Sequence, residues 1–110
     1  LARYEGDRYY QVDPRQPGNP WFLPTLWLAD YEIAVAKKEK DLVEVKKKLD
    51  WVAHHALASG ILAEQMHPYT GEPVSASPLS WSHSQFVITV INYLNKLEEL
   101  GVCVACNPVR

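Results

Sequence analysis

The longest apolar run of the chain predicts its first helix. The run extends from Trp21 to Val35 and is apolar on nearly all sides. Asn19 and Pro20 stand directly before it and form a typical helix start, with Asn as N-cap and Pro at the first helical position. Pro24 lacks the N–H that a helix interior uses, which moves the expected start of regular helix toward Pro24.

A second helix is predicted by the spacing of apolar residues after a charged connector at 37–41. From Leu42 to Ala56 they recur in steps of three and four, which places them on one face of an amphipathic helix. Gly60 is the expected end of this helix, because glycine readily adopts the left-handed conformation that closes helices.

The third predicted helix begins near residues 80–82 and has a strongly apolar face up to Leu97. Ser82 and Gln85 have the spacing of a capping box, and 77–78 is an alternative start. Gly101 is the expected end.

Together these patterns predict an all-α chain whose helices have too few neighbours. The first helix is apolar nearly all round, and the last is apolar over more than half its circumference. Such helices are covered on several sides in folded proteins. The chain is therefore expected to be part of a larger helical array. It also opens directly into a dense motif at Leu1 rather than into a loose polar tail, so we expect a segment of a longer protein.

Composition excludes several function classes. The net charge is −2, from 11 basic and 13 acidic side chains, and a phosphate-binding surface needs a basic excess. No nucleic-acid partner is therefore expected. No membrane is expected either, because no apolar run approaches the ~20 residues of a bilayer span. No charged-then-apolar signal opens the chain, which gives an expectation of cytoplasmic localisation.

Cys103 and Cys106 form a single C-x-x-C, which is a weak signal. A structural zinc site needs four ligands, and the histidines do not supply the second pair. We expect two free thiols in a reducing compartment, no metal and no cofactor.

Residues 59–80 form a long irregular segment that contains both apolar side chains and turn residues. Loops longer than about 12–15 residues are usually functional or disordered, and the apolar residues here favour an ordered loop that builds a site. Glu64 lies among Leu62, Ala63 and Met66, where a carboxylate is costly unless it is paired or used. Glu72 is expected to be a solvated turn residue.

The chain is rich in aromatic residues, with four Trp and six Tyr. Trp27 and Trp51 are interpreted as core residues. Trp21 and Trp81 stand in loops or at first helical turns, where flat rings suit the faces of sugars. This points to carbohydrate, although aromatic loops also serve protein partners.

Three motifs in order resemble glycoside hydrolase family fifteen, the glucoamylase and glucodextranase family. The first is Arg3-Tyr-Glu-Gly-Asp7 with Tyr9-Tyr10, and the second is Gly18-Asn-Pro-Trp-Phe-Leu23. The third begins at Ala63-Glu-Gln65 and continues through 67–71 to Leu79-Ser-Trp-Ser82. The order and spacing match the C-terminal third of that family, so residues 1–110 are interpreted as the C-terminal segment of a catalytic domain.

The resemblance implies an (α/α)6 barrel and hydrolysis of α-glucosidic bonds at non-reducing ends, with inversion and release of β-D-glucose. It implies that Glu64 is the general base. It also implies a substrate-binding set, which comprises Arg3, Tyr4, Trp21, Gln65 and Trp81. The linkage stays open between α-1,4, α-1,6 and trehalose.

The general acid that the family uses lies upstream of this sequence, so the isolated chain is expected to be inactive. Its exposed inner-helix faces are expected to favour self-association in the absence of the missing N-terminal part of the barrel. The expected partner is an α-glucan oligosaccharide or polysaccharide. The alternatives are a non-catalytic carbohydrate-binding or regulatory module on the same barrel, or a small helical interaction protein that matches the motifs by chance.

Overall fold

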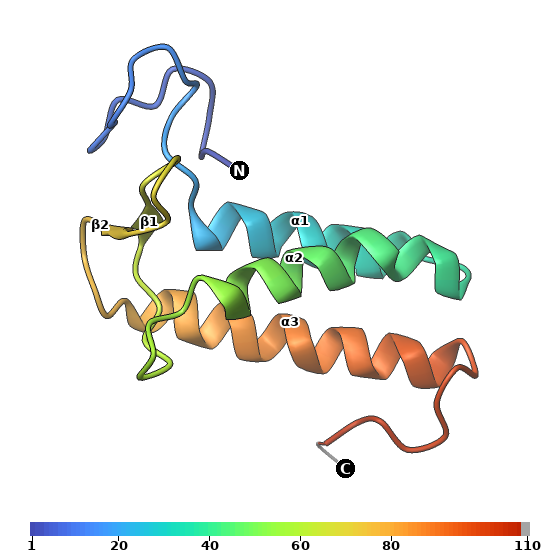
Figure 1. Cartoon of the computed structure of the whole chain (residues 1–110). Coiled ribbons are helices and arrows are strands. Elements are labelled where there is room, and N and C mark those ends of the chain that lie inside the picture. The colour runs from blue at the N-terminus through green and yellow to red at the C-terminus, as the bar shows by residue number, and fades with distance from the viewer. Residues whose placement is uncertain (109–110) are drawn as a thin grey trace.

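The computed structural model describes residues 1–108 and confirms the all-α prediction. Its elements are α1 (Phe22–Val35), the 3-10 helix η1 (Glu39–Leu42), α2 (Val43–His54), β1 (Gln65–Met66), β2 (Pro73–Val74) and α3 (Ser80–Glu99). The three α-helices lie side by side, with α2 antiparallel to the other two (Figure 1). The architecture is consistent with part of an all-α barrel. None of the helices within residues 1–108 has the length and hydropathy of a membrane span.

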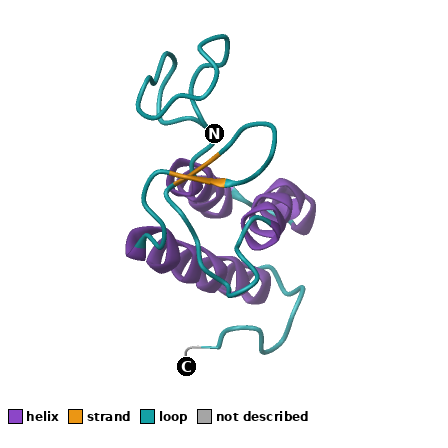
Figure 2. Cartoon of the chain, turned by 60° about the vertical axis from the view of Figure 1, so that its left-hand side comes forward, coloured by secondary structure: helices purple, strands orange, loops and turns teal. Residues whose placement is uncertain are grey.

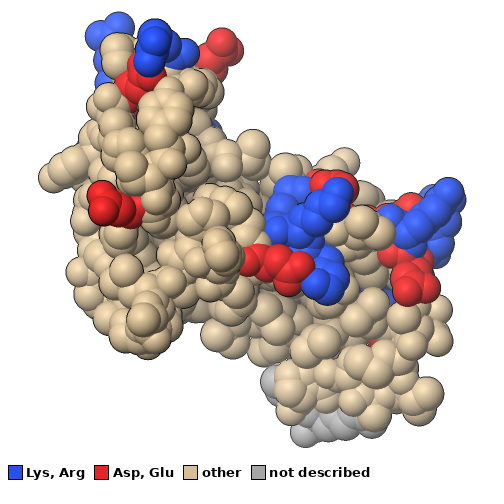
Figure 3. Space-filling view, viewed as in Figure 1, with Lys and Arg blue, Asp and Glu red and all other residues tan. Residues whose placement is uncertain are grey.

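The core lies where the inward faces of the helices meet. α1 and α2 supply most of its fully buried residues, and α3 packs against them with partly buried side chains such as Phe86 and Val90. The buried residues of α1 and α2 include Phe22, Leu26, Ile33, Val45, Leu49 and Val52. The opposite face of α2 carries exposed Lys–Asp and Lys–Glu ion pairs, visible as mixed charge in Figure 3. The amphipathic prediction for this helix is therefore correct.

The predicted start of the first helix is displaced from Asn19. The helix begins at Phe22, with Trp21 as an N-cap that has extended backbone. Asn19 is buried and its side chain bonds Val12, Tyr10 and Gln65 instead of capping a helix. Pro24 is tolerated because it lies in the first turn, where backbone N–H groups have no intrahelical partner.

The second helix ends at His54 and not at Gly60. After His55 the chain forms a separate turn, in which the Gly60 N–H donates to the Leu57 carbonyl at 2.7 Å. Gly60 has a φ of +81°, so the predicted left-handed conformation is confirmed. It closes this later turn and not the helix.

The third helix lacks the predicted capping box. Leu79 is its N-cap, with no side-chain hydrogen bond, and the Ser82 hydroxyl donates to the Ala63 carbonyl at 2.8 Å. The predicted C-terminal end is confirmed. The Gly101 N–H donates to Glu98 and the Val102 N–H to Leu97, which is the Schellman arrangement.

The expectation of two free thiols is wrong, because Cys103 and Cys106 form a disulfide. The turn after α3 brings their Cα atoms to 5.9 Å, within the range that a disulfide spans.

The segment at 59–80 is ordered and contains a small antiparallel hairpin. Gln65 pairs with Val74 and Met66 with Pro73. Figure 2 shows the hairpin and the N-terminal loop at one end of the helices, the end at which α1 and α3 begin.

The two valines of α2 offer a matched test of this packing. Val45 is fully buried, whereas Val43 is 53% exposed on the same helix. Val45→Ala is expected to lower the free energy of unfolding by about 2 kcal/mol, because it deletes buried methyl groups and leaves a cavity. Val43→Ala is expected to change it by less than about 0.5 kcal/mol. Urea unfolding measures both, and equal losses would contradict the packing described.

Candidate functional site

A cavity of about 270 Å³ lies at the end of the molecule where α1 and α3 begin. Four of the residues predicted from the sequence meet around it: Arg3, Trp21, Glu64 and Trp81. The remaining lining residues are Leu23, Pro24, Trp27 and Leu79. Side chains from four separate segments, including the starts of both helices, therefore share one cavity.

Glu64 and its neighbour Ala63 are positioned by hydrogen bonds, of which one reaches the start of α1 and another the start of α3. Its carbonyl accepts from the Phe22 N–H of α1, and its own N–H donates to the Ala76 carbonyl. One residue earlier, the Ala63 carbonyl accepts from the Ser82 hydroxyl in the first turn of α3. The backbone around Glu64 is thus held between the first turns of α1 and α3.

The Glu64 carboxylate is half-buried and has two donors. The Ser75 hydroxyl donates to Oε2 at 2.5 Å, and the Gln65 amide donates to the same oxygen at 3.4 Å. Ser75 has a φ of +65°, which is uncommon for a residue other than glycine and is a type of strain that clusters at functional sites. Sequence reasoning missed Ser75, because four serines occur in this segment and no pattern distinguishes them.

Arg3 is oriented by Asp7. Its Nε and Nη2 atoms donate to the two carboxylate oxygens at 2.8 Å each, and the guanidinium lies 4.2 Å from the ring centroid of Trp21. The hydrogen bond from Arg3 and one from the Tyr9 N–H hold the pKa of Asp7 below its ordinary value, against the effect of burial. The same pair raises the pKa of Arg3. The side chain of Arg3 is 35% exposed, so part of the guanidinium faces solvent.

The backbone of Gly18 packs closely against Asp7 and helps to fix its position. A Cβ at Gly18 would lie 2.9 Å from the Asp7 Cβ, so only glycine fits there without a shift of the loop. The Asp7 N–H also donates to the Pro17 carbonyl at 2.8 Å. The Gly-Asn-Pro-Trp motif therefore positions the carboxylate that orients Arg3.

The other two predicted binding residues lie outside the cavity lining. Gln65 is fully buried behind Glu64, where its Oε1 accepts from Asn19. Tyr4 is 60% exposed, with its ring centroid 5.5 Å from the Arg3 guanidinium carbon.

The prediction that Trp27 is a core residue is wrong. It is 47% exposed and lines the cavity next to Trp81. The prediction for Trp51 is consistent with the structure, in which Trp51 packs against Phe22 with ring centroids 5.4 Å apart. Residue type alone could not distinguish the exposed Trp27 from Trp51, which packs against the core.

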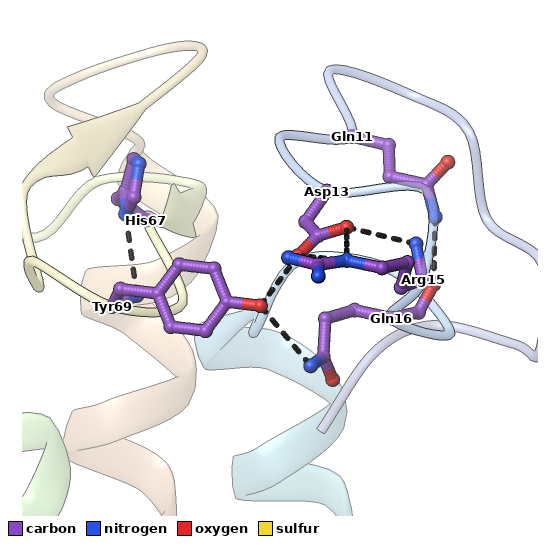
Figure 4. Close-up of polar contacts among 6 residues, drawn as sticks. All are labelled: Gln11, Asp13, Arg15, Gln16, His67 and Tyr69. Atoms are coloured by element: carbon purple, nitrogen blue, oxygen red, sulfur yellow. Dashed lines mark hydrogen bonds and ion pairs between the residues drawn. The ribbon is translucent and has the colours of Figure 1, made fainter.

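A polar latch joins the N-terminal loop to the hairpin (Figure 4). It consists of Asp13, Arg15, Gln16 and Tyr69. The Tyr69 hydroxyl donates to Asp13 at 2.6 Å and accepts from Gln16 at 3.2 Å, while Arg15 forms an ion pair with Asp13 at 2.8 Å. Arg15 and then Tyr69 hold the pKa of Asp13 well below its usual range. The latch connects the loop that carries Arg3 to the hairpin that follows Glu64.

His67 closes the turn that presents Tyr69. Its Nδ1 accepts from the backbone N–H groups of Tyr69 and Thr70 at 3.2 and 3.1 Å. Within residues 1–108 no group of His, Cys, Asp and Glu side chains is arranged to hold a metal ion.

A larger hollow of about 700 Å³ lies among residues of the N-terminal loop, including Glu5, Arg8 and Gln16. Most of its lining residues are exposed, and it holds none of the predicted site residues. We therefore place the candidate site at the smaller cavity, where the predicted residues converge.

Comparison with known proteins supports the resemblance found in the motifs. Residues 45–91, which include Glu64 and Trp81, match the model of glycosyl hydrolases family 15. The chain is also 38% identical over 99 residues to a protein of Methanocaldococcus jannaschii named as an uncharacterized glycosyl hydrolase. That match covers 82% of this chain and 15% of the relative. No solved structure matches the chain significantly.

Residues 45–91 are therefore similar to glycosyl hydrolases of family 15. The chain spans about 15% of the length of the curated relative that it matches.

The latch predicts a measurable coupling between Tyr69 and Asp13. Tyr69→Phe removes a donor to the ionised carboxylate, so the pKa of Asp13 is expected to rise toward its ordinary value of 3.8. It stays below that value because Arg15 remains. Carbon-13 NMR titration of the Asp13 carboxyl measures the change. Tyr10→Phe is the control, because Tyr10 has the same exposed fraction as Tyr69, 60%, and lies in the loop that carries Asp13.

The depressed pKa of Asp13 determines how the stability of the N-terminal loop depends on pH. The ionised latch stabilises the loop fully above pH 3.8, and the stabilisation is lost as the pH falls through the folded-state pKa of Asp13. An Asp13 pKa that is identical in wild type and Tyr69→Phe would contradict the latch.

Proposed function

We propose that residues 1–110 are the C-terminal part of the catalytic domain of a longer inverting glycoside hydrolase. The proposed reaction is cleavage of α-glucosidic bonds at non-reducing ends, with release of β-D-glucose. One observation carries the proposal. A half-buried carboxylate, Glu64, shares a cavity with a cation, Arg3, and with Trp21 and Trp81. Flat rings, a carboxylate and a guanidinium are the groups that bind the apolar faces and the hydroxyls of a sugar.

In this proposal Glu64 is the general base. Inverting enzymes use one carboxylate to deprotonate a water while a second carboxylic acid, about 6.5–9.5 Å away, protonates the leaving oxygen. Glu64 would take the proton of the water that attacks the anomeric carbon, and that water would add to the face opposite the leaving group. The hydrogen bond from Ser75 occupies one carboxylate oxygen, Oε2, which leaves Oε1 to accept from water.

The residues around Glu64 would bind and orient the sugar. Arg3 would donate to hydroxyl groups, because its remaining N–H groups are not used by Asp7. Trp21 and Trp81 would pack against the sugar ring. Gln65 would act on the substrate through Glu64, whose carboxylate it contacts, and Tyr4 would bind at the exposed rim beside Arg3.

The general acid is proposed to come from another part of the longer polypeptide. Among the described residues, Glu64 is the one carboxylate that lines the cavity. Glu72 follows in the same hairpin, but it is exposed and lies outside the cavity lining. The isolated chain is therefore expected to lack hydrolytic activity, since an inverting enzyme needs both carboxyl groups.

Proton NMR of the products tests the reaction class. The longer polypeptide is expected to release β-glucose first from at least one of maltose, isomaltose and trehalose, and the active substrate identifies the linkage. The 110-residue chain alone is expected to release none. Release of the non-reducing glucose of maltose or isomaltose as the α anomer would refute inversion. Inversion of trehalose gives α- and β-glucose in equal amounts, so release of α-glucose alone from trehalose would refute it as well. Turnover by the isolated chain would refute the missing acid.

Two glutamates of the same segment test the identity of the base. In the longer polypeptide, Glu64→Gln is expected to lower kcat by about 10²–10⁴-fold, because general-base assistance is lost, while sugar binding is retained. Glu72→Gln is the matched control and is expected to leave kcat unchanged. Steady-state kinetics and calorimetric sugar titration measure both effects. Undiminished turnover in Glu64→Gln would refute the assignment.

A further inference from the structure

Trp27 differs from Trp51, the tryptophan of α2, in what surrounds its ring. It lies on α1 four residues after Leu23, so both side chains occupy one face of the helix, and both line the cavity that contains Glu64. Trp27 is 47% exposed and its neighbour Trp81 is 58% exposed. Trp51 of α2, in contrast, packs against the core, where it is partly buried, and it does not line the cavity.

The two exposed rings form a corner. Their centroids are 5.8 Å apart and their planes make an angle of 62°, an edge-on arrangement favoured by the ring quadrupoles. An edge-on pair covers a face of only one ring, whereas a stacked pair would cover one face of each. A sugar in the cavity can therefore contact aromatic surface on two sides.

The orientation of the Trp27 ring is set by a chain of hydrogen bonds between α1 and α3. The indole Nε1 of Trp27 donates to Gln85 Oε1 at 3.2 Å, and Gln85 Nε2 donates to Asp30 Oδ2 at 2.6 Å. Asn92 donates to the other Asp30 oxygen at 3.1 Å. Because an ionised carboxylate only accepts, Asp30 draws the NH₂ group of Gln85 toward itself. The amide oxygen of Gln85 is then left to face Trp27.

This arrangement is more specific than helix packing requires. Two apolar helices can pack without a half-buried amide–carboxylate pair, and such polar groups cost free energy to the extent that they are shielded from water and not bonded. Here the amide of Gln85 is used at both ends, with one end at the indole of a cavity residue. We propose, on the basis of the function proposed above, that Trp27 is a specificity-determining residue. With Trp81 it forms an aromatic corner that contacts the sugar beside Glu64, and Gln85 and Asp30 hold the Trp27 ring in place.

The test uses the longer polypeptide in two backgrounds. Dissociation constants for maltose, isomaltose and trehalose are measured by titration calorimetry in the Glu64→Gln background, and KM and kcat are measured with Glu64 present. Trp27→Leu is expected to weaken binding of the preferred disaccharide and to raise KM by about 2- to 12-fold, the equivalent of one aromatic contact. The expected kcat is unchanged, because the contact is equal in ground and transition states.

Three further variants separate contact from folding. Trp27→Phe keeps a ring and is expected to restore most of the binding. Gln85→Leu keeps the Trp27 side chain but removes the acceptor of its indole N–H, so the ring is no longer held in one orientation. This variant is expected to weaken sugar binding by a smaller factor than Trp27→Leu. Tyr31→Leu is the matched control, because Tyr31 is an exposed aromatic residue of the same helix that does not line the cavity. It is expected to leave KM unchanged. Thermal unfolding of each variant confirms that it is folded at the assay temperature.

The outcomes distinguish this inference from the proposed function. If the wild type binds a disaccharide and Trp27→Leu binds it equally well, the aromatic corner is refuted while the catalytic proposal stands. An effect of Trp27→Leu that is matched by Tyr31→Leu, or that falls on kcat alone, refutes it as well. If the polypeptide binds a sugar without hydrolysing it, the catalytic proposal fails and the binding constants still decide the role of Trp27. If it binds none of the three sugars, both are refuted.

Discussion

The hydrogen bonding of the short extended segment at 62–66 is the constraint on which the candidate site depends. Leu62 and Glu64 accept backbone hydrogen bonds from Leu79 and Phe22, at the starts of α3 and α1. The Met66 N–H donates to Pro20, and Gln65 forms a bridge with Trp21. If the two helices moved apart, these bonds could not all persist. The position of the Glu64 carboxylate is therefore a consequence of how α1 and α3 pack.

Side-chain interactions then convert this backbone arrangement into a site. Asp7 holds the Arg3 guanidinium against Trp21, and Ser75 holds the Glu64 carboxylate from the opposite side of the hairpin. The latch between Asp13 and Tyr69 joins the two loops that carry these groups. None of these interactions lies in the apolar core. The core determines where the helices begin, and the polar contacts at their ends determine how the functional groups point.

The parts of the structure that were predicted correctly are those with a local cause. The amphipathic face of α2 and the end of α3 at Gly101 follow from residue spacing and from the conformational freedom of glycine. The errors arose where a side chain had a distant partner. Asn19 and Ser82 both have the residue type of a helix cap, yet Asn19 bonds the N-terminal loop and Gln65, and Ser82 bonds Ala63. A cap is a local bond, and here a tertiary bond replaced it.

The sequence by itself determined the helical class of this protein, its family resemblance and the residues Arg3, Trp21, Glu64 and Trp81, because periodicity and ordered motifs are properties of the linear chain. Only the tertiary structure showed that these four side chains share one cavity, that Ser75 contacts Glu64 and that Trp27 lies at the cavity and not in the core. The physical reason is that a contact between residues far apart in sequence depends on how helices pack. Residue type and spacing constrain each helix separately, but they do not specify which exposed edges meet.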